Sequence, residues 1–147
     1  MAIDPQLIEV SSCLVDDYYP LVDSEKWCVA AICASEHNCA DGIGQMERHN
    51  ETDEVFVLMR GESVLFVATG QCECGIGRIS NVKMDSLRVY NVKRGVWHAC
   101  ALGSDAVVLV VENSGTGRSN SDYAQLTTGQ RRLVMDACAG LTGPTKV

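Results

Sequence analysis

The chain has 147 residues, 46% of them hydrophobic and 21% charged, which predicts one globular domain and excludes disorder along the whole length. Its net charge is -7, so nucleic acid is excluded as the main partner, because such a partner needs a basic face. The longest apolar run, Ala106 to Val111, is far shorter than the roughly 20 residues of a membrane-spanning helix, and no membrane partner is expected.

Residues 1–26 are predicted to form an N-terminal extension that pairs with the rest of the fold or with a dimer partner. Asp4 and Pro5 favour a short turn at its start. Acidic residues such as Glu9, with no basic residue before the apolar stretch, argue against a secretion signal, so a cytoplasmic location is expected. Several of the eight cysteines lie inside apolar runs, as Cys28 and Cys33 do, which favours buried, reduced thiols.

From Trp27 onward, short apolar runs alternate with turn residues, a pattern typical of a β-sandwich or barrel. Strands are predicted at Trp27–Ser35, Gly44–His49, Val55–Arg60, Ser63–Thr69, Ser86–Val92, Trp97–Leu102 and Ala106–Glu112. Gly61 and Gly103 each lie between two apolar runs and indicate tight hairpins. Longer loops are predicted from Gly70 to Asn81 and from Asn113 to Ser121.

The pattern changes to a helical period near the C-terminus. One face of a helix would carry Leu133, Val134, Ala137, Cys138 and Leu141. Gly140 is a suitable stop for this helix, which is expected to pack outside the β domain. Residues 27–113 are therefore predicted to form a mainly β barrel, and residues 114–147 a loop and a short C-terminal helix.

Four polar residues stand out against this pattern. Glu47 and His49 are two residues apart, so on a strand they point to the same side. Glu54 has the opposite parity, but the polar segment 50–53 can supply a bend that returns it to the same interior. His98 begins another strand just after a turn. The four side chains are predicted to converge inside the barrel.

The spacing of these residues resembles the two motifs of the cupin superfamily, which are small jelly-roll barrels. In the first motif His49 fits the second histidine, Glu54 follows after four residues, and Gly61 follows after six more. In the second motif Gly95 and His98 match the glycine and the histidine. The resemblance covers roughly residues 27–113 and implies a cupin-type jelly-roll barrel.

The chain departs from the family pattern at several positions. Glu47 replaces the first histidine of the first motif, so the resemblance implies a ligand set of Glu47, His49, Glu54 and His98. The remaining departures are Asp41 and Leu87 in place of glycines, Lys93 in place of proline and Leu102 in place of asparagine. Two imidazoles and two carboxylates suit divalent manganese, iron, zinc or nickel, and the extra carboxylate shifts the preference toward manganese or iron. No organic cofactor is expected.

A metal-free site is the alternative. Two carboxylates in a low-dielectric interior repel each other, so Glu47 or Glu54 would then hold a proton with a raised pKa and the pair would act as acid and base. With a metal, we expect an isomerase or lyase acting on a carbohydrate or a small hydroxy or keto acid, with Glu47 and Glu54 as catalytic residues. The rival hypotheses are a non-catalytic ligand-binding module and a structural cupin without a metal. A homodimer is expected, with Leu7 to Cys13 reaching across to the neighbour.

Other candidate residues carry weaker signals. His37 and Cys39 are assigned to a surface loop, and Cys72 and Cys74 to a loop without a second pair of metal ligands. Arg118, in a glycine-rich turn, is a candidate partner for an anionic substrate. The aromatic residues Trp97, Phe56 and Tyr90 could line a pocket or belong to the core, and for Phe56 the core is favoured.

Overall fold

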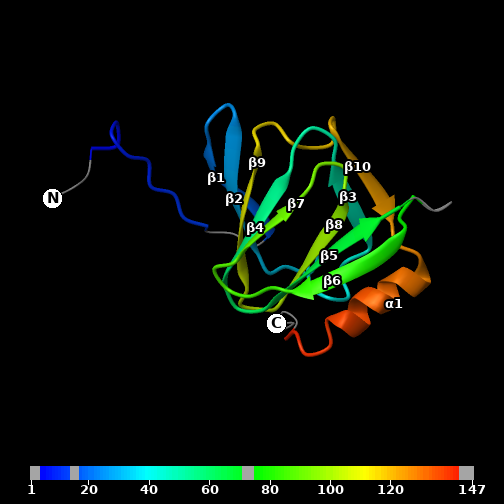
Figure 1. Ribbon diagram of the computed structural model, residues 1–147. Coiled ribbons are helices and arrows are strands. Elements are labelled where there is room, and N and C mark those ends of the chain that lie inside the picture. The colour runs from blue at the N-terminus through cyan, green and yellow to red at the C-terminus, as the bar shows by residue number, and fades with distance from the viewer. Residues whose placement is uncertain (1–3, 14–16, 71–74, 143–147) are drawn as a thin grey trace.

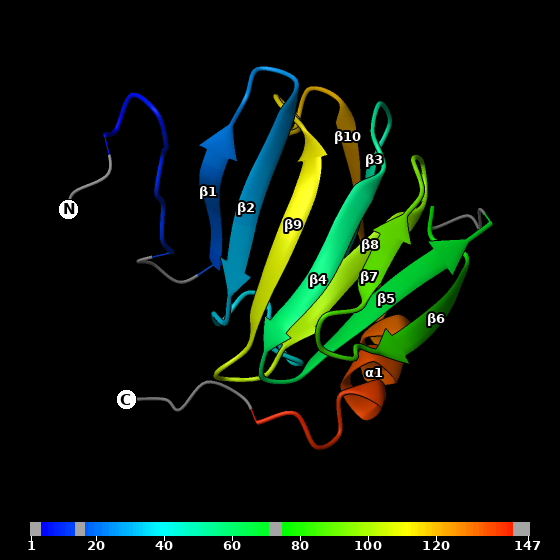
Figure 2. The same cartoon turned by 60° about the vertical axis from the view of Figure 1, so that its left-hand side comes forward.

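A computed structural model describes residues 4–13, 17–70 and 75–142. Its strands form two five-stranded antiparallel sheets that face each other (Figures 1 and 2), in the orders β1-β2-β9-β4-β7 and β10-β3-β8-β5-β6. The strands are β1 (Asp17–Asp23), β2 (Trp27–Cys33), β3 (Gln45–His49), β4 (Glu54–Arg60), β5 (Ser63–Thr69), β6 (Arg78–Lys83), β7 (Val89–Val92), β8 (Trp97–Leu102), β9 (Val107–Asn113) and β10 (Ser121–Gln125), followed by the helix α1 (Thr128–Ala137). The mainly β class with one C-terminal helix is confirmed.

The inner core fills one end of the space between the sheets. It is built from alternate residues of the central strands, including Phe56, Leu58, Val108 and Val110 of the first sheet and Leu65 and Leu102 of the second. Burial of each such side chain contributes about 1.5–3 kcal/mol to folding. The same inward alternation continues past Phe56 to Glu54 and past Val110 to Glu112, so polar groups enter the barrel at its other end.

A second core lies between the outer face of the second sheet and α1. It joins Met46, Phe66 and Trp97 of the sheet to Val134 and Cys138. The predicted helix face is correct for these last two, which are 1% and 3% exposed, but wrong for Leu133, which is 59% exposed. Leu133 is one residue from Val134 and therefore lies on another side of the helix.

Three strands lie outside the predicted set. β1 pairs with β2 and β10 pairs with β3, so both flanking segments add an edge strand to a sheet. The predicted loop from Gly70 to Asn81 is wrong from Arg78 onward, because β6 begins there and pairs with β5. β7 begins at Val89, three residues later than predicted.

None of the helices in the described part of the chain has the length and apolar content needed to cross a bilayer.

The tight turns predicted at Gly61 and Gly103 are present, but the hairpins are wrong, because these turns join β4 to β5 and β8 to β9 and the two strands of each pair lie in different sheets. Gly61 has φ +74°, a backbone conformation that residues with a side chain rarely adopt. A Cβ atom at this position would also lie 2.6 Å from the Cα of Ala106. The position therefore requires glycine for two independent reasons.

Candidate metal centre and pocket

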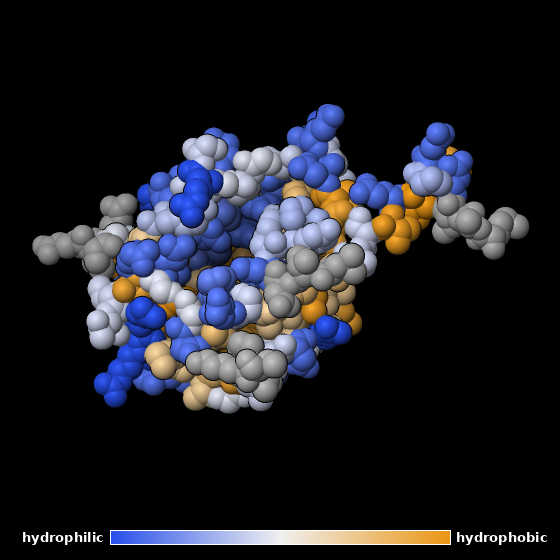
Figure 3. All heavy atoms as spheres, turned by 180° about the vertical axis from the view of Figure 1, so that it is seen from behind, coloured by the Kyte–Doolittle hydropathy of each residue, from blue (hydrophilic) through white to orange (hydrophobic). Residues whose placement is uncertain are grey.

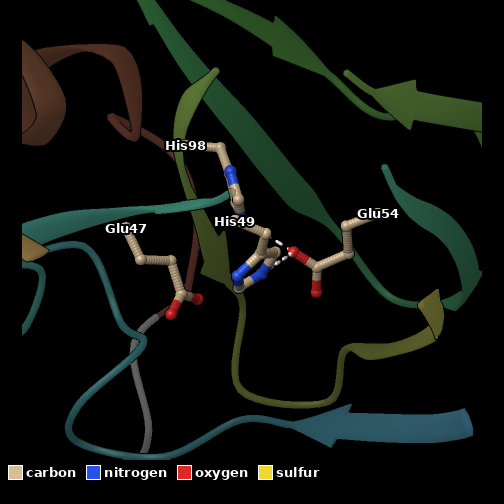
Figure 4. Close-up of side chains that lie close together, drawn as sticks. All are labelled: Glu47, His49, Glu54 and His98. Carbon is tan, nitrogen blue, oxygen red and sulfur yellow. Dashed lines mark hydrogen bonds and ion pairs between the residues drawn. The ribbon is translucent and has the colours of Figure 1, made fainter. Parts of the chain in front are cut away.

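The four predicted site residues lie together inside the barrel (Figure 4). Glu47 and His49 come from β3, and His98 of β8 is directly opposite Glu47 in the strand register. Residues 50–53 carry the chain from the second sheet to the first, so Glu54, at the start of β4, faces the two histidines from across the interior. One potential ligand atom from each residue lies within 4.8 Å of all the others. The predicted convergence is confirmed.

Hydrogen bonds fasten the turn before His98 to the segment between β3 and β4. The backbone N–H of Gly95 donates to the carbonyl oxygen of His49 at 2.8 Å. The carboxylate of Asp53 accepts from the backbone N–H of Arg94 at 2.9 Å and from Lys93 Nζ at 3.1 Å. These contacts, led by the backbone one, lower the pKa of Asp53. They hold the second motif in place against the first.

Glu54 Oε2 is the point on which both imidazoles converge. It lies 2.9 Å from His49 Nε2 and 2.7 Å from His98 Nε2. The other ring nitrogens are held from outside: His49 Nδ1 is 2.7 Å from Ser121 Oγ, and His98 Nδ1 is 2.9 Å from the carbonyl oxygen of Val96. Such outer partners orient histidine rings in metal sites, leaving Nε2 to face the interior.

The contact between His98 and Glu54 indicates that the site suits a cation. The carbonyl oxygen of Val96 can only accept, so His98 Nδ1 carries the hydrogen, and Nε2 of a neutral ring presents a lone pair to Glu54. In that neutral state neither atom can donate across the 2.7 Å contact, so a proton on His98 Nε2 or a shared cation is needed between them. Adjacent ligands about 2.1 Å from a metal and at right angles to each other lie roughly 3 Å apart, so the two atoms are spaced like neighbouring ligands of one ion.

Without a metal ion, protonated imidazoles can supply the positive charge beside Glu54. Burial alone lowers the pKa values of His49 and His98, but the hydrogen bonds and negative charge of Glu54 outweigh it and raise both. Burial likewise raises the pKa of Glu54, and contacts with the two imidazoles outweigh it and lower that pKa. The metal-free site therefore favours a carboxylate beside imidazolium groups.

A fifth residue, Glu112 on β9, belongs to the same site and was missed from the sequence. Its Oε2 atom lies 3.7 Å from His49 Nε2 and has no hydrogen bond among the described residues, while Oε1 accepts one from the hydroxyl of Tyr18 at 2.8 Å. Burial and the charge of Glu54 raise the pKa of Glu112. The raised pKa expected at Glu47 or Glu54 in a metal-free site is thus found at Glu112, and that of Glu54 is lowered. The parity that Glu112 shares with Val110 was the available signal.

The site opens into a pocket of about 590 Å³. The molecule is hollowed on the side seen in Figure 3, where hydrophilic residues frame the opening. Phe56 belongs to the core, as favoured, and also lines this pocket. Trp97 and Tyr90 are absent from the described lining: Trp97 lies in the outer core beneath the guanidinium of Arg48, and Tyr90 packs on the inner core.

The remaining candidates lie at the edge of the pocket or away from it. The His37 side chain is 74% exposed, as a surface loop predicts. That prediction is wrong for Cys39, which is buried and donates from Sγ to Asp41 Oδ1 at 2.9 Å. Arg118 is not among the described lining residues, and its guanidinium lies 5.5 Å from the ring centre of Tyr123. The pair Cys72 and Cys74 lies outside the described residues.

Comparison with known proteins gives structural matches only. No family model and no curated protein sequence matches the chain. Hydroquinone 1,2-dioxygenase from Sphingomonas sp. TTNP3 matches with a TM-score of 0.58 and 10% identity over 79% of this chain and 80% of that one. Oxalate decarboxylase from Bacillus subtilis matches with a TM-score of 0.50 and 16% identity, over 90% of this chain and 37% of that one. A cupin-2 domain protein from Shewanella frigidimarina gives a TM-score of 0.47 at 14% identity, over 74% and 86%.

Two facing antiparallel sheets that enclose a histidine and glutamate cluster define a jelly-roll barrel with a candidate metal centre. The dioxygenase and the decarboxylase belong to the cupin superfamily. The chain accordingly has the cupin fold, as its two motifs predicted. At these identities the likeness concerns the fold, and the function must be argued from the site itself.

Proposed function

We propose that the protein is a metal-dependent enzyme of isomerase or lyase type that acts on a small carbohydrate or hydroxy or keto acid. The observation that carries the proposal is the convergence of two imidazoles and two carboxylates, with one potential ligand atom of each within 4.8 Å of all the others and His98 Nε2 only 2.7 Å from Glu54 Oε2. Buried charged groups are paired or coordinate metals. A cation shared by the cluster would satisfy all four side chains together.

Glu47, His49, Glu54 and His98 would hold a divalent ion such as manganese, iron, zinc or nickel. When bound, the ion would polarise a substrate carbonyl or hydroxyl group as a Lewis acid. The two glutamates differ in what they can do. Glu54 is 5% exposed and its Oε2 is engaged by both histidines, which favours its ionised form. Glu47 is only half-buried and lines the pocket.

Glu47 is therefore the better placed of the two to touch a substrate and to move a proton between neighbouring atoms of it. Glu54 would support the reaction by fixing the charge and the orientation of the imidazoles. Proton transfer of this kind fits isomerisation or elimination next to a carbonyl group.

Metal content tests the proposal directly. Protein purified without chelators should contain about one equivalent of metal, measured by mass spectrometry, and Glu54→Ala and His98→Ala should lose most of it. His37→Ala, at the exposed mouth of the pocket, is the matched control and should keep it. A tightly held metal that survives both site substitutions would show that the site is wrong. No metal, and no ligand that stabilises the fold in a thermal screen, would favour a structural cupin.

A further inference from the structure

The pocket has a charge pattern that bears on the class of substrate. Four acidic residues, Asp17, Glu47, Glu54 and Glu112, are among the residues that line it, whereas the described lining contains no lysine and no arginine. Among the described lining residues, the only groups that can carry positive charge are the imidazoles of His37, His49 and His98. Two of these histidines already face Glu54.

The uncharged polar groups of the pocket are amides and hydroxyls. Gln45 and Gln125 lie side by side, joined by a hydrogen bond of 3.0 Å from Gln125 Nε2 to Gln45 Oε1. Tyr18 and Tyr123 add aromatic rings with hydroxyl groups, and Phe56 adds an apolar wall. Such groups donate to and accept from hydroxyls without adding charge.

We infer that the pocket selects an uncharged, hydroxyl-rich substrate such as a neutral sugar, and discriminates against its carboxylate analogue. An anion that enters loses its hydration and needs a cationic partner in return. A divalent ion at the site would be largely matched by the charges of Glu47 and Glu54, which leaves little for a substrate carboxylate. This inference rests on the proposed function and chooses the carbohydrate over the hydroxy or keto acid.

Matched pairs of sugars test the inference. D-glucose and D-glucuronate, and D-galactose and D-galacturonate, differ in charge but share a ring, and their binding can be measured by calorimetry on metal-loaded and on chelator-treated protein. We expect each neutral sugar to bind at least tenfold more tightly than its uronate. Equal or tighter binding of the uronates, or no binding of either kind, would overturn the inference. The metal content of the protein is measured separately, and protein that holds no metal would count against the proposed function alone.

A gain-of-charge variant makes the test sharper. Gln45 lies two residues before Glu47 on β3 and lines the same pocket, so Gln45→Arg adds a cation there. The variant should narrow or reverse the preference for the neutral sugar. Ser80→Arg, on exposed β6 outside the pocket lining, adds the same charge elsewhere and should leave the preference unchanged. An identical effect of both variants would show that net charge, not the pocket, sets the preference.

Discussion

Substitution of Glu54 by glutamine separates the charge of this residue from its volume. The folded pKa values of His49 and His98 are raised above 6.5, so the stability they contribute is present below pH 6.5 and is lost as the pH rises through the raised values. The pKa of Glu54 is lowered below 4.5, so its contribution is present above that pH and is lost as the pH falls through the lowered value. Near pH 6 both contributions act together.

Loss of one partner from a buried charge pair costs about 3–5 kcal/mol. In chelator at pH 6, we therefore expect Glu54→Gln to lose about this much free energy of unfolding, or roughly 6–20 °C in Tm for a chain of this size. At higher pH the cost should shrink, because the imidazoles become neutral and the glutamine amide can donate to the lone pair of His98 Nε2.

Urea denaturation at a series of pH values measures this effect. Glu51→Gln removes the same charge from an exposed side chain and should change stability by no more than about 0.5 kcal/mol. A cost for Glu54→Gln that is the same at every pH would contradict the reasoning, because it would assign the role of Glu54 to packing and not to charge.

Three further predictions concern the metal and the fold. Metal affinity should fall as the pH drops through the raised pKa values of His49 and His98, because a protonated imidazole cannot bind a metal. Calorimetry in buffers of different ionisation enthalpy measures the protons released on binding. A metal affinity that does not change with pH would exclude these two histidines as ligands. Glu47→His should keep the metal and shift competition between manganese and zinc toward zinc, and unchanged selectivity would remove Glu47 from the ligand set. Gly61→Ala should destabilise the fold by more than about 1 kcal/mol, because of its positive φ and the 2.6 Å approach to Ala106; a neutral effect on the urea midpoint would contradict this.

The sequence predicted the central strands well because they carry a physical signal. Strands such as β4, β5 and β9 are apolar runs bounded by turn residues, and their inward residues fill the core. The three strands that it missed, β1, β6 and β10, are all at the edges of sheets. β6 contains no buried residue, so its sequence lacks the alternation that marks a strand, and its pairing with β5 depends on tertiary context.

The candidate site was predicted through spacing, with one omission. The parity of Glu47 and His49 and the bend before Glu54 were enough to bring those side chains together, and the turn at Gly95 added His98. Glu112 has no place in either motif, so only its parity with the buried valines of β9 could have revealed it. The contact between His98 and Glu54 depends on atomic positions that no sequence pattern encodes.

Diffraction from crystals soaked in Mn²⁺ tests the central claim most directly. The account predicts one anomalous peak bonded to Glu47, His49, Glu54 and His98 at roughly 2.0–2.3 Å, absent from crystals of Glu54→Gln. A peak at another place, or an empty cluster in which Glu54 simply pairs with two imidazolium groups, would contradict it.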